Sequence, residues 1–470
     1  MEHIHFVTGK LAEPMLRRVL EQLAAEEPAN ERGFSYSVQV LPITVAALMT
    51  TKWIARHLRV PPQATRVILP GYVTGEMGEL PPHDRCTMEL GPRDVHQLPT
   101  FLGREHESTS YGDWSIEIVA EINHAPRWDP HDLVQEAARL REAGADIIDV
   151  GCEPGGGWHE VGDCVRRLRD AGFRVSIDSL DRTEIEAAVR SGAELVLSVQ
   201  ASNREFAPDW GCEVVVIPDD PDDLDSLHAT VAFLADRNVS MRLDPILEPI
   251  GLGFAPSLGR YLAVRETYPD AEMLMGIGNL SEMTEVDSAG VNLLLLGFCQ
   301  ELGIRSVLTT EVINWARTSV AECDIARRLV HFAVQHQAPP KHVDPRLVML
   351  RDPERSTVEP AALDQLASSL RDHHVRLFAD EQQLHMVFRG EHLAGTDPMA
   401  LFASFLQHYP RELDPSHAFY LGYELAKAVT AQTLGKRYEQ DVALDWGFLT
   451  RPESRHRSEP KSEPPEPPSR

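Results

Sequence analysis

Short apolar runs alternate with amphipathic segments through the middle of the chain. The apolar runs are typical of buried strands, and the segments between them carry apolar residues at helical spacing. The expected strands are Ile116–Ile122, Ile147–Val150, Val175–Ile177, Leu195–Val199, Val214–Ile217, Met241–Leu243, Met273–Ile277 and Ser306–Leu308. The expected helices include Asp132–Ala143, Val161–Ala171, Arg182–Ser191, Leu224–Asn238 and Val291–Leu302. Eight strand–helix repeats predict a (β/α)8 TIM barrel over residues 114–337, in preference to an open doubly wound sheet.

The same pattern predicts a smaller unit on each side of the barrel. In residues 1–110, the apolar runs His3–Thr8, Tyr36–Leu41 and Val67–Leu69 alternate with the helical segments Pro14–Ala25 and Val45–Leu58, which predicts a parallel α/β domain. Residues 343–450 read as an α+β domain with two paired strands, at 375–378 and 385–388, and helices at 399–405 and 418–433. Residues 451–470 are rich in Pro, Glu, Arg and Ser, so we expect a disordered tail.

The amino-acid composition argues against several classes of function. The 45 basic and 72 acidic residues give a formal net charge of −27, which argues against binding to nucleic acid or to an anionic membrane surface. No apolar run is long enough to cross a bilayer, and the beginning of the chain does not resemble a secretory signal. The six cysteines stand singly, which suits a reducing compartment. We therefore expect a cytoplasmic protein that binds small molecules, with a homodimer as one option for its assembly.

Polar residues gather where the predicted strands end. The strand ends carry Glu121-Ile-Asn123, Asp149 before Glu153, Asp178, Gln200 before Asn203, Asp244 and Asn279. In a TIM barrel these ends form one rim and hold the active site. Carboxylates and amides at one rim suit a flat heterocycle with several N–H and C=O groups, because a carboxylate can accept two hydrogen bonds from an aminopyrimidine edge.

These segments resemble the dihydropteroate synthase-related, pterin-binding family. Residues 143–153, Ala-Gly-Ala-Asp-Ile-Ile-Asp-Val-Gly-Cys-Glu, resemble the second strand of those barrels, and residues 174–179, Arg-Val-Ser-Ile-Asp-Ser, resemble the third. Leu243-Asp-Pro245 followed by Gly251-Leu-Gly-Phe254 is similar to a later strand end with a short insertion, and Met273-Leu-Met-Gly276 matches the next strand. The two flanking domains are similar to family members of tetrahydromethanopterin-type one-carbon metabolism.

The resemblance implies roles for individual residues. Asp178 and Asp244 would hold the pterin ring, and Glu153 would lie where the synthases have a mobile loop. The predicted pterin-binding residues are Asp149, Glu153, Asp178, Asn203, Asp244 and Asn279, and the predicted catalytic residues are Asn123, Asp178 and Asp244. Asn123 matches the residue that in the synthases helps bind metal, here expected to be Mg²⁺, and pyrophosphate. The implied activity is the joining of 6-hydroxymethyl-dihydropterin pyrophosphate to an aryl amine, in tetrahydromethanopterin- or folate-type cofactor biosynthesis.

Three polar contacts of the synthases are missing from the chain. The fourth-strand Asn is replaced by Leu197 or Ser198, with Asn203 as a downstream substitute. The seventh-strand Ser-Arg-Lys is replaced by Gly278-Asn279-Leu-Ser281, and the last-strand Arg-x-His by Leu308-Thr-Thr310. Arg317, just beyond the eighth strand, is the candidate cation for phosphate or the second substrate.

Asn279 is also compatible with functions other than that of a synthase. The pattern Gly276-x-x-Asn279-x-Ser281 resembles pterin-dependent methyltransferases, in which no pyrophosphate leaves and no cationic cluster is needed. A non-catalytic pterin-binding protein is the third alternative. The acceptor amine and the roles of the outer domains do not follow from the residues.

Overall fold

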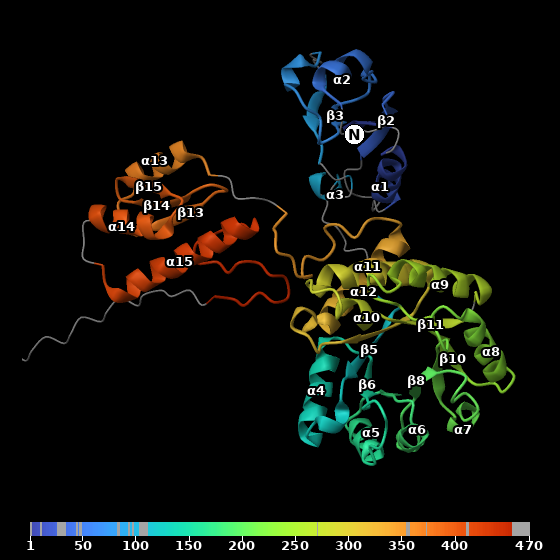
Figure 1. Ribbon diagram of the computed structural model, residues 1–470. Coiled ribbons are helices and arrows are strands. Elements are labelled where there is room, and N and C mark those ends of the chain that lie inside the picture. Colours follow the sequence, from blue (N-terminus) through green and yellow to red (C-terminus); the bar gives the residue numbers. More distant parts are fainter. Residues whose placement is uncertain are drawn as a thin grey trace, which may run out of the picture. The chain divides into compact units, whose positions relative to one another are not determined.

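The computed structural model describes residues 2–9, 12–25, 34–43, 46, 49–81, 85–92, 95, 98–102, 111–269, 271–353, 358–372, 374–409 and 413–453. The chain divides into two compact units, Met1–Ser110 and Tyr111–Arg470. Figure 1 shows the first unit, the barrel and the C-terminal elements, each of which we describe by itself.

The N-terminal unit is a parallel sheet between two apolar layers. Its strands, in the spatial order β2-β1-β3-β4, are β1 (Glu2–Thr8), β2 (Phe34–Val40), β3 (Arg66–Leu69) and β4 (Thr87–Leu90). The helical elements are α1 (Glu13–Ala25), α2 (Thr51–His57), η2 (Met77–Glu79) and α3 (Leu98–Phe101). Alternating residues of β3 face opposite layers: Ile68 packs in the cluster that contains Leu20 of α1, whereas Val67 packs in the one that contains Ile54 of α2.

Two details of this unit differ from the sequence prediction. The strand β4 was not predicted, because its four residues include no buried side chain. Of the helix predicted over residues 45–58, the structure shows α2 at Thr51–His57, and residues 45, 47 and 48 lie outside the described residues. Thr50 is extended and forms a β-bridge with Thr74, and its side chain caps the helix by accepting a hydrogen bond from the Trp53 N–H.

The barrel is closed by eight parallel strands, as the sequence predicts. The strands, in chain order, are β5 (Glu117–Ile122), β6 (Ile147–Gly151), β7 (Val175–Asp178), β8 (Leu195–Val199), β9 (Glu213–Val216), β10 (Met241–Leu243), β11 (Glu272–Gly276) and β12 (Ser306–Thr310). The helical elements are η4 (Ala125–Arg127), α4 (Pro130–Ala143), α5 (Val161–Asp170), α6 (Arg182–Arg190), α7 (Ala207–Trp210), α8 (Leu224–Ala235), α9 (Phe254–Thr267), α10 (Gly278–Ser281), α11 (Ser288–Leu302), η5 (Asn314–Ala316) and α12 (Ser319–His336). Strand β12 pairs with β5, which closes the ring.

The C-terminal elements combine an antiparallel sheet with helices. Its strands are β13 (Arg376–Ala379), β14 (Leu384–Phe388) and β15 (Glu391–Gly395), and its helices are α13 (Pro360–Ser369), α14 (Pro398–His408) and α15 (Pro415–Leu434). The predicted pair β13–β14 is present. The third strand, β15, was not predicted, because its five residues include no buried side chain.

Two further predictions concern the C-terminal tail and membrane-spanning segments. Residues 454–470 of the predicted disordered tail lie outside the described residues. In the described part of the chain, no helix is both long enough and apolar enough to span a membrane.

Candidate functional site

The barrel interior changes from aliphatic to acidic toward the carboxyl ends of its strands. Val119 and Ile147 are register partners in a buried cluster that also contains Leu195, Val215 and Leu274. Two residues further along the same strands, Glu121 and Asp149 are again register partners. Side chains two apart on a strand point to the same face. The two carboxyl groups therefore lie directly above an aliphatic layer that shields them from water on one side.

Asp178 at the end of β7 joins these two residues in a three-carboxylate cluster. One oxygen of each of Glu121, Asp149 and Asp178 lies within 4.8 Å of the other two. The Ser176 hydroxyl donates a 2.6 Å hydrogen bond to Oδ1 of Asp149, and the Ser198 hydroxyl donates a 3.3 Å hydrogen bond to Oδ1 of Asp178. Among the described residues, no lysine, arginine or histidine forms an ion pair with any of the three carboxylates.

Burial and mutual repulsion keep protons on this carboxylate cluster. Desolvation raises the pKa of Glu121 to about 7, with further contributions from the charges of Asp178 and Glu282. Desolvation also raises the pKa of Asp149 and that of Asp178, and for Asp149 the neighbouring carboxylates add to the effect. At neutral pH the cluster therefore favours any ligand that brings positive charge or hydrogen-bond donors.

The end of β8 has a strained backbone that presents Ser198 to Asp178. The β8–β9 pairing shifts register between Val196 and Val199, and Ser198 has a φ of 70°. Asn203 stabilises this turn from within: its Oδ1 accepts the Gln200 N–H, and its Nδ2 donates to the Ser198 carbonyl. Asn203, predicted as a pterin contact, thus has both ends of its amide engaged with backbone groups.

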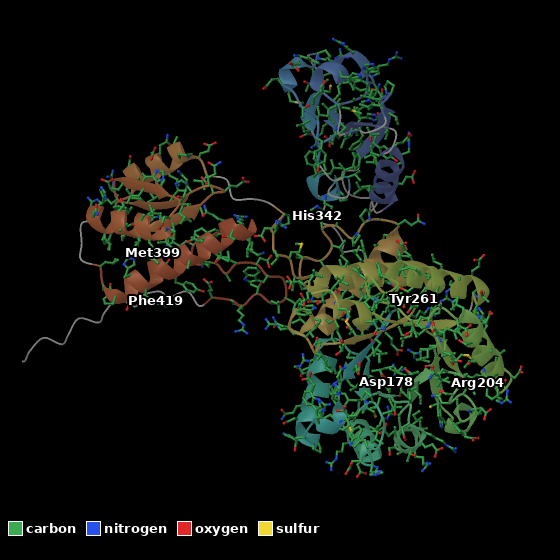
Figure 2. The ribbon with its side chains drawn as sticks, viewed as in Figure 1. Asp178, Arg204, Tyr261, His342, Met399 and Phe419 are labelled. Carbon is green, nitrogen blue, oxygen red and sulfur yellow. The ribbon has the colours of Figure 1, made fainter. Side chains whose placement is uncertain are left out.

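Asp244 forms a second buried carboxylate site at the end of β10. Its Oδ1 accepts a 2.5 Å hydrogen bond from the Tyr261 hydroxyl of α9 and a 2.8 Å bond from the Ile246 N–H. Ile246 has a φ of 65°, which is rare for a β-branched residue and turns its N–H toward Asp244. Desolvation raises the pKa of Asp244 to about 6, although both hydrogen bonds act in the opposite direction. Figure 2 labels Asp178 and Tyr261 in the barrel.

Asn279 lies in α10, which follows β11, and its side chain is close to Asp244. A Cβ atom built on Gly276 would lie 3.6 Å from Nδ2 of Asn279 and 3.8 Å from Oδ2 of Asp244, so the two side chains border the same small space. Nδ2 of Asn279 donates a hydrogen bond to the Leu247 carbonyl. The described contacts of Asn279 leave its amide oxygen open to a donor from a ligand.

The remaining predicted residues lie in the loops that follow the strands. Oδ1 of Asn123 accepts a 2.6 Å hydrogen bond from the Thr310 hydroxyl. Glu153 pairs with Arg127 and with His124, so its charge is balanced within the loops after β5 and β6. Arg317 is exposed at the end of the turn η5. The role of Asn123 in metal binding stays a prediction, and its amide oxygen is the group that would contact the ion.

Three side chains of this site were not assigned roles from the sequence. Glu121 was noted only as part of a strand end, Ser198 only as a replacement, and Tyr261 not at all. Glu121 was detectable from its position in the strand. It stands two residues after Val119, as Asp149 stands two residues after Ile147, so both acidic side chains point into the barrel. Tyr261 was not detectable, because it lies in a helix and reaches Asp244 only through the tertiary structure.

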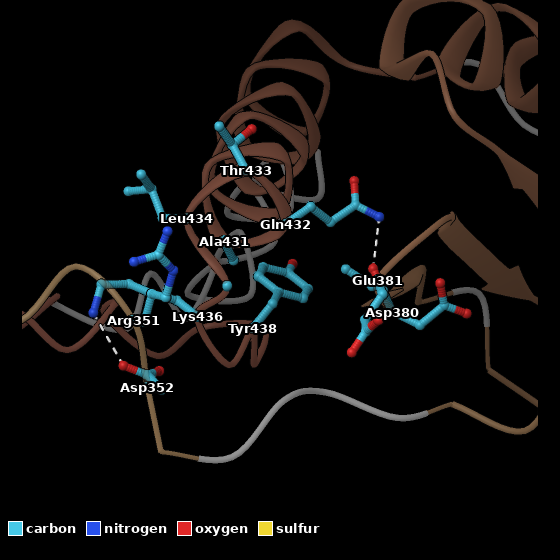
Figure 3. A pocket seen from close by; sticks show the side chains of 12 residues that line it. Arg351, Asp352, Asp380, Glu381, Ala431, Gln432, Thr433, Leu434, Lys436 and Tyr438 are labelled. Atoms are coloured by element: carbon cyan, nitrogen blue, oxygen red, sulfur yellow. Dashed lines mark hydrogen bonds and ion pairs between the residues drawn. The ribbon is translucent and has the colours of Figure 1, made fainter.

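A concave surface outside the barrel contains charges that are already paired. A cavity of about 290 Å³ lies between the end of α15 and the turn after β13 (Figure 3). Nζ of Lys436 contacts Oδ1 of Asp352 at 3.0 Å and two backbone carbonyls, and Nε2 of Gln432 donates to the Asp380 carbonyl. With these polar groups satisfied, the cavity offers fewer free groups to a ligand than the barrel does.

Two family models match parts of the chain. Residues 124–231 match a model described as "Pterin binding enzyme", which agrees with the resemblance that the strand motifs indicate. Residues 2–93 match a family of unknown function (DUF6513). An uncharacterized protein of Methanocaldococcus jannaschii is 26% identical over 370 residues, covering 70% of this chain and 69% of that protein.

Several solved structures are similar to about half of the chain. Dihydropteroate synthase of Yersinia pestis, with a pterine-sulfa conjugate, is 16% identical at a TM-score of 0.39 and covers 47% of this chain and 95% of its own. The Thermus thermophilus enzyme in complex with 6HMPPP is 18% identical at a TM-score of 0.37, and the match covers 47% of this chain and 94% of that enzyme. The Xanthomonas albilineans enzyme with 4-aminobenzoic acid is 20% identical at a TM-score of 0.38, and the match covers 47% of this chain and 93% of that enzyme. Similarity this distant does not by itself assign an activity.

Proposed function

We propose that the barrel of this chain, in which residues 124–231 match the pterin-binding enzyme model, binds a reduced pterin at the acidic rim and joins its pyrophosphate ester to an aryl amine. The observation that carries the proposal is the pair of carboxylates at the ends of β7 and β10, the half-buried Asp178 and the buried Asp244. Desolvation raises the pKa of both. Both lie on the one rim where all eight parallel strands end.

The aminopyrimidine edge of a pterin presents N–H donors in the geometry that a carboxylate accepts. Protein donors act on each carboxylate of the pair: Ser198 on Asp178, and Tyr261 with the backbone N–H groups of Ile246 and Gly276 on Asp244. A carboxylate oxygen can accept more than one hydrogen bond, so both groups can still accept N–H donors from the ring. Asn279, beside Asp244, can accept a hydrogen bond from a ring N–H through its amide oxygen.

Departure of pyrophosphate requires positive charge at the rim. The described residues that directly follow the eight strands include no lysine or arginine, so the charge must come from elsewhere. Arg317, after η5, is one candidate within the chain, and Mg²⁺ bound with the pyrophosphate substrate is another.

Release of pyrophosphate tests this function directly. Purified full-length protein is mixed with Mg²⁺, 6-hydroxymethyl-dihydropterin pyrophosphate and either 4-aminobenzoate or its ribosyl-phosphate analogue. We expect pyrophosphate release that depends on the amine and is lost in Asp244→Asn. The preferred amine distinguishes a folate-type from a tetrahydromethanopterin-type pathway.

Methyl transfer from a methyl-pterin is the second candidate. The specific observation in its favour is Asn279 at the position where the synthases carry cations, because an Asn can hydrogen-bond a ring nitrogen and no anion has to leave. Pterin binding without pyrophosphate release would favour this candidate. Transfer of the methyl group to a corrinoid then separates it from simple pterin binding.

A further inference from the structure

The carboxylate cluster of Glu121, Asp149 and Asp178 contains an oxygen with no partner in the protein. Asp149 is fully buried, and its Oδ1 accepts the Ser176 hydroxyl, whereas its Oδ2 accepts no hydrogen bond from the described residues. A buried carboxylate oxygen without a donor is energetically costly, by about 1–3 kcal/mol or more for a charged group. Its environment is therefore incomplete without a further group.

The spacing and chemistry of the cluster fit a metal ion. The three oxygens lie within 4.8 Å of one another, and two ligands on opposite sides of an ion at 2.1–2.6 Å lie about 4–5 Å apart. All three donors are carboxylate oxygens, which suit hard divalent cations rather than Zn²⁺ or copper. Cys152 lies close by in the chain, but burial beside Glu184 raises the pKa of its thiol, so it is not a thiolate ligand.

The charged groups that act on the cluster are also acidic. The charged groups that act on Glu121 are Asp178 and Glu282, and those that act on Asp149 are Asp178 and Glu121. Every one of them is acidic. Nearby Gly151 leaves room for Glu121, because a Cβ atom there would lie 2.5 Å from Oε1 of Glu121.

We propose that Glu121, Asp149 and Asp178 form a binding site for one divalent cation of the Mg²⁺ or Mn²⁺ type, at the base of the acidic rim. The site is separate from Asn123, where the family resemblance implies a metal. The proposal does not depend on the reaction that the protein catalyses. Asp178 has a second oxygen, so an ion at this site leaves it able to contact a pterin.

Binding of Mn²⁺ alone to the full-length, chelator-treated protein tests the proposal. Free Mn²⁺ is measured by electron paramagnetic resonance at pH 8, and the melting temperature is followed in parallel. We expect one tightly bound Mn²⁺ per chain and a higher melting temperature with the ion. Glu121→Gln and Asp149→Asn each weaken binding at least about tenfold, because each removes a charged ligand. Mg²⁺ competes for the same site.

Two control variants separate this site from other acidic groups. Glu322 is also a buried carboxylate, but both of its oxygens accept hydrogen bonds, so Glu322→Gln should bind Mn²⁺ like the wild type. Asp222 is an exposed carboxylate in an acidic loop, and Asp222→Asn should also leave the tight site unchanged.

The proposal is overturned if the wild type binds no Mn²⁺ below about 1 mM, the weak end of protein Ca²⁺ sites. It is also overturned if folded Glu121→Gln and Asp149→Asn bind the ion as the wild type does. Circular dichroism establishes that each variant is folded, and either variant alone suffices for the comparison. Because no pterin is present, a negative result leaves the proposed synthase function to its own test.

Discussion

A Cβ atom on Gly151 would lie 2.5 Å from Oε1 of Glu121, so the glycine at the end of β6 makes room for the carboxylate at the end of β5. The neighbouring strands thus share one space at the rim, and only a residue without a side chain lets Glu121 turn toward Asp149 and Asp178. The Ile122 carbonyl, at 3.2 Å from the same point, limits movement in the other direction.

Gly151→Ala is therefore expected to lower the free energy of unfolding by about 1–3 kcal/mol, as overpacking in a buried site does. Part of this loss should disappear in the Glu121→Ala background, giving a coupling of at least about 0.5 kcal/mol in a double-mutant cycle. Denaturant unfolding of the four proteins measures it. Gly259→Ala is the matched control, because a Cβ at this exposed helical glycine meets nothing within 4 Å. Strictly additive effects would contradict the contact.

Tyr261→Phe is expected to move the pH dependence of pterin binding to higher pH. The Tyr261 hydroxyl stabilises the charged form of Asp244, whose pKa burial raises to about 6. Without that donor the pKa of Asp244 rises further, so less carboxylate is present at pH 7. Fluorescence titration with a reduced pterin from pH 5 to 9 gives the midpoint. Tyr268→Phe, which removes a hydroxyl that contacts His228, should leave the midpoint in place.

The raised pKa of Asp244 leads us to expect that the free energy of unfolding depends on pH. Its pKa is raised from 3.8 to about 6 in the folded protein, so the folded state holds a proton that the unfolded state has already lost. The contribution of Asp244 to stability is therefore greatest below pH 4 and falls as pH rises from about 4 to about 6. The difference in unfolding free energy between wild type and Asp244→Asn should change by roughly 3 kcal/mol over this range. A difference independent of pH would show that Asp244 is ionised throughout.

Asp178→Asn is expected to abolish detectable pterin binding while the protein remains folded. The amide cannot accept two hydrogen bonds from an aminopyrimidine edge, because one of its two ends is a donor. Fluorescence titration measures the affinity, and circular dichroism measures the fold. Asp163→Asn, on the exposed face of α5, is the control. Near-wild-type pterin affinity in Asp178→Asn would remove Asp178 from the site.

Arg327→Lys is expected to destabilise the barrel by about 1.5–3 kcal/mol through lost charged hydrogen bonds. The Arg327 guanidinium is 2% exposed and contacts Asp146, Asp324 and the carbonyls of Ile116 and Gly144, which joins α12 to the start of β5 and the end of α4. A lysine cannot reproduce this planar set of donors. Arg166→Lys, in an exposed pair, should change the melting temperature little. Equal melting temperatures for both variants would refute the role of Arg327.

The barrel was predictable because its signals are local. Each strand is an apolar run that needs no distant partner to be recognised, and all eight predicted runs overlap the strands β5 to β12. Gly144 has a φ of 118° and caps the end of α4, a left-handed position that glycine adopts readily. The edge strand β4 and the short strand β15 have no buried residue, and they therefore carried no comparable signal.

The sequence by itself determined which residues stand at the strand ends, since that depends only on where each apolar run stops. The tertiary structure decided which of them meet. Parallel pairing of β5, β6 and β7 brings Glu121, Asp149 and Asp178 together on top of an aliphatic layer, and packing of α9 brings Tyr261 to Asp244. The tertiary structure also places the amide of Asn203 against the backbone, where it accepts from the Gln200 N–H and donates to the Ser198 carbonyl. Burial and proximity create the raised pKa values and the unpartnered oxygen of Asp149, and both properties arise from the three-dimensional surroundings of a residue.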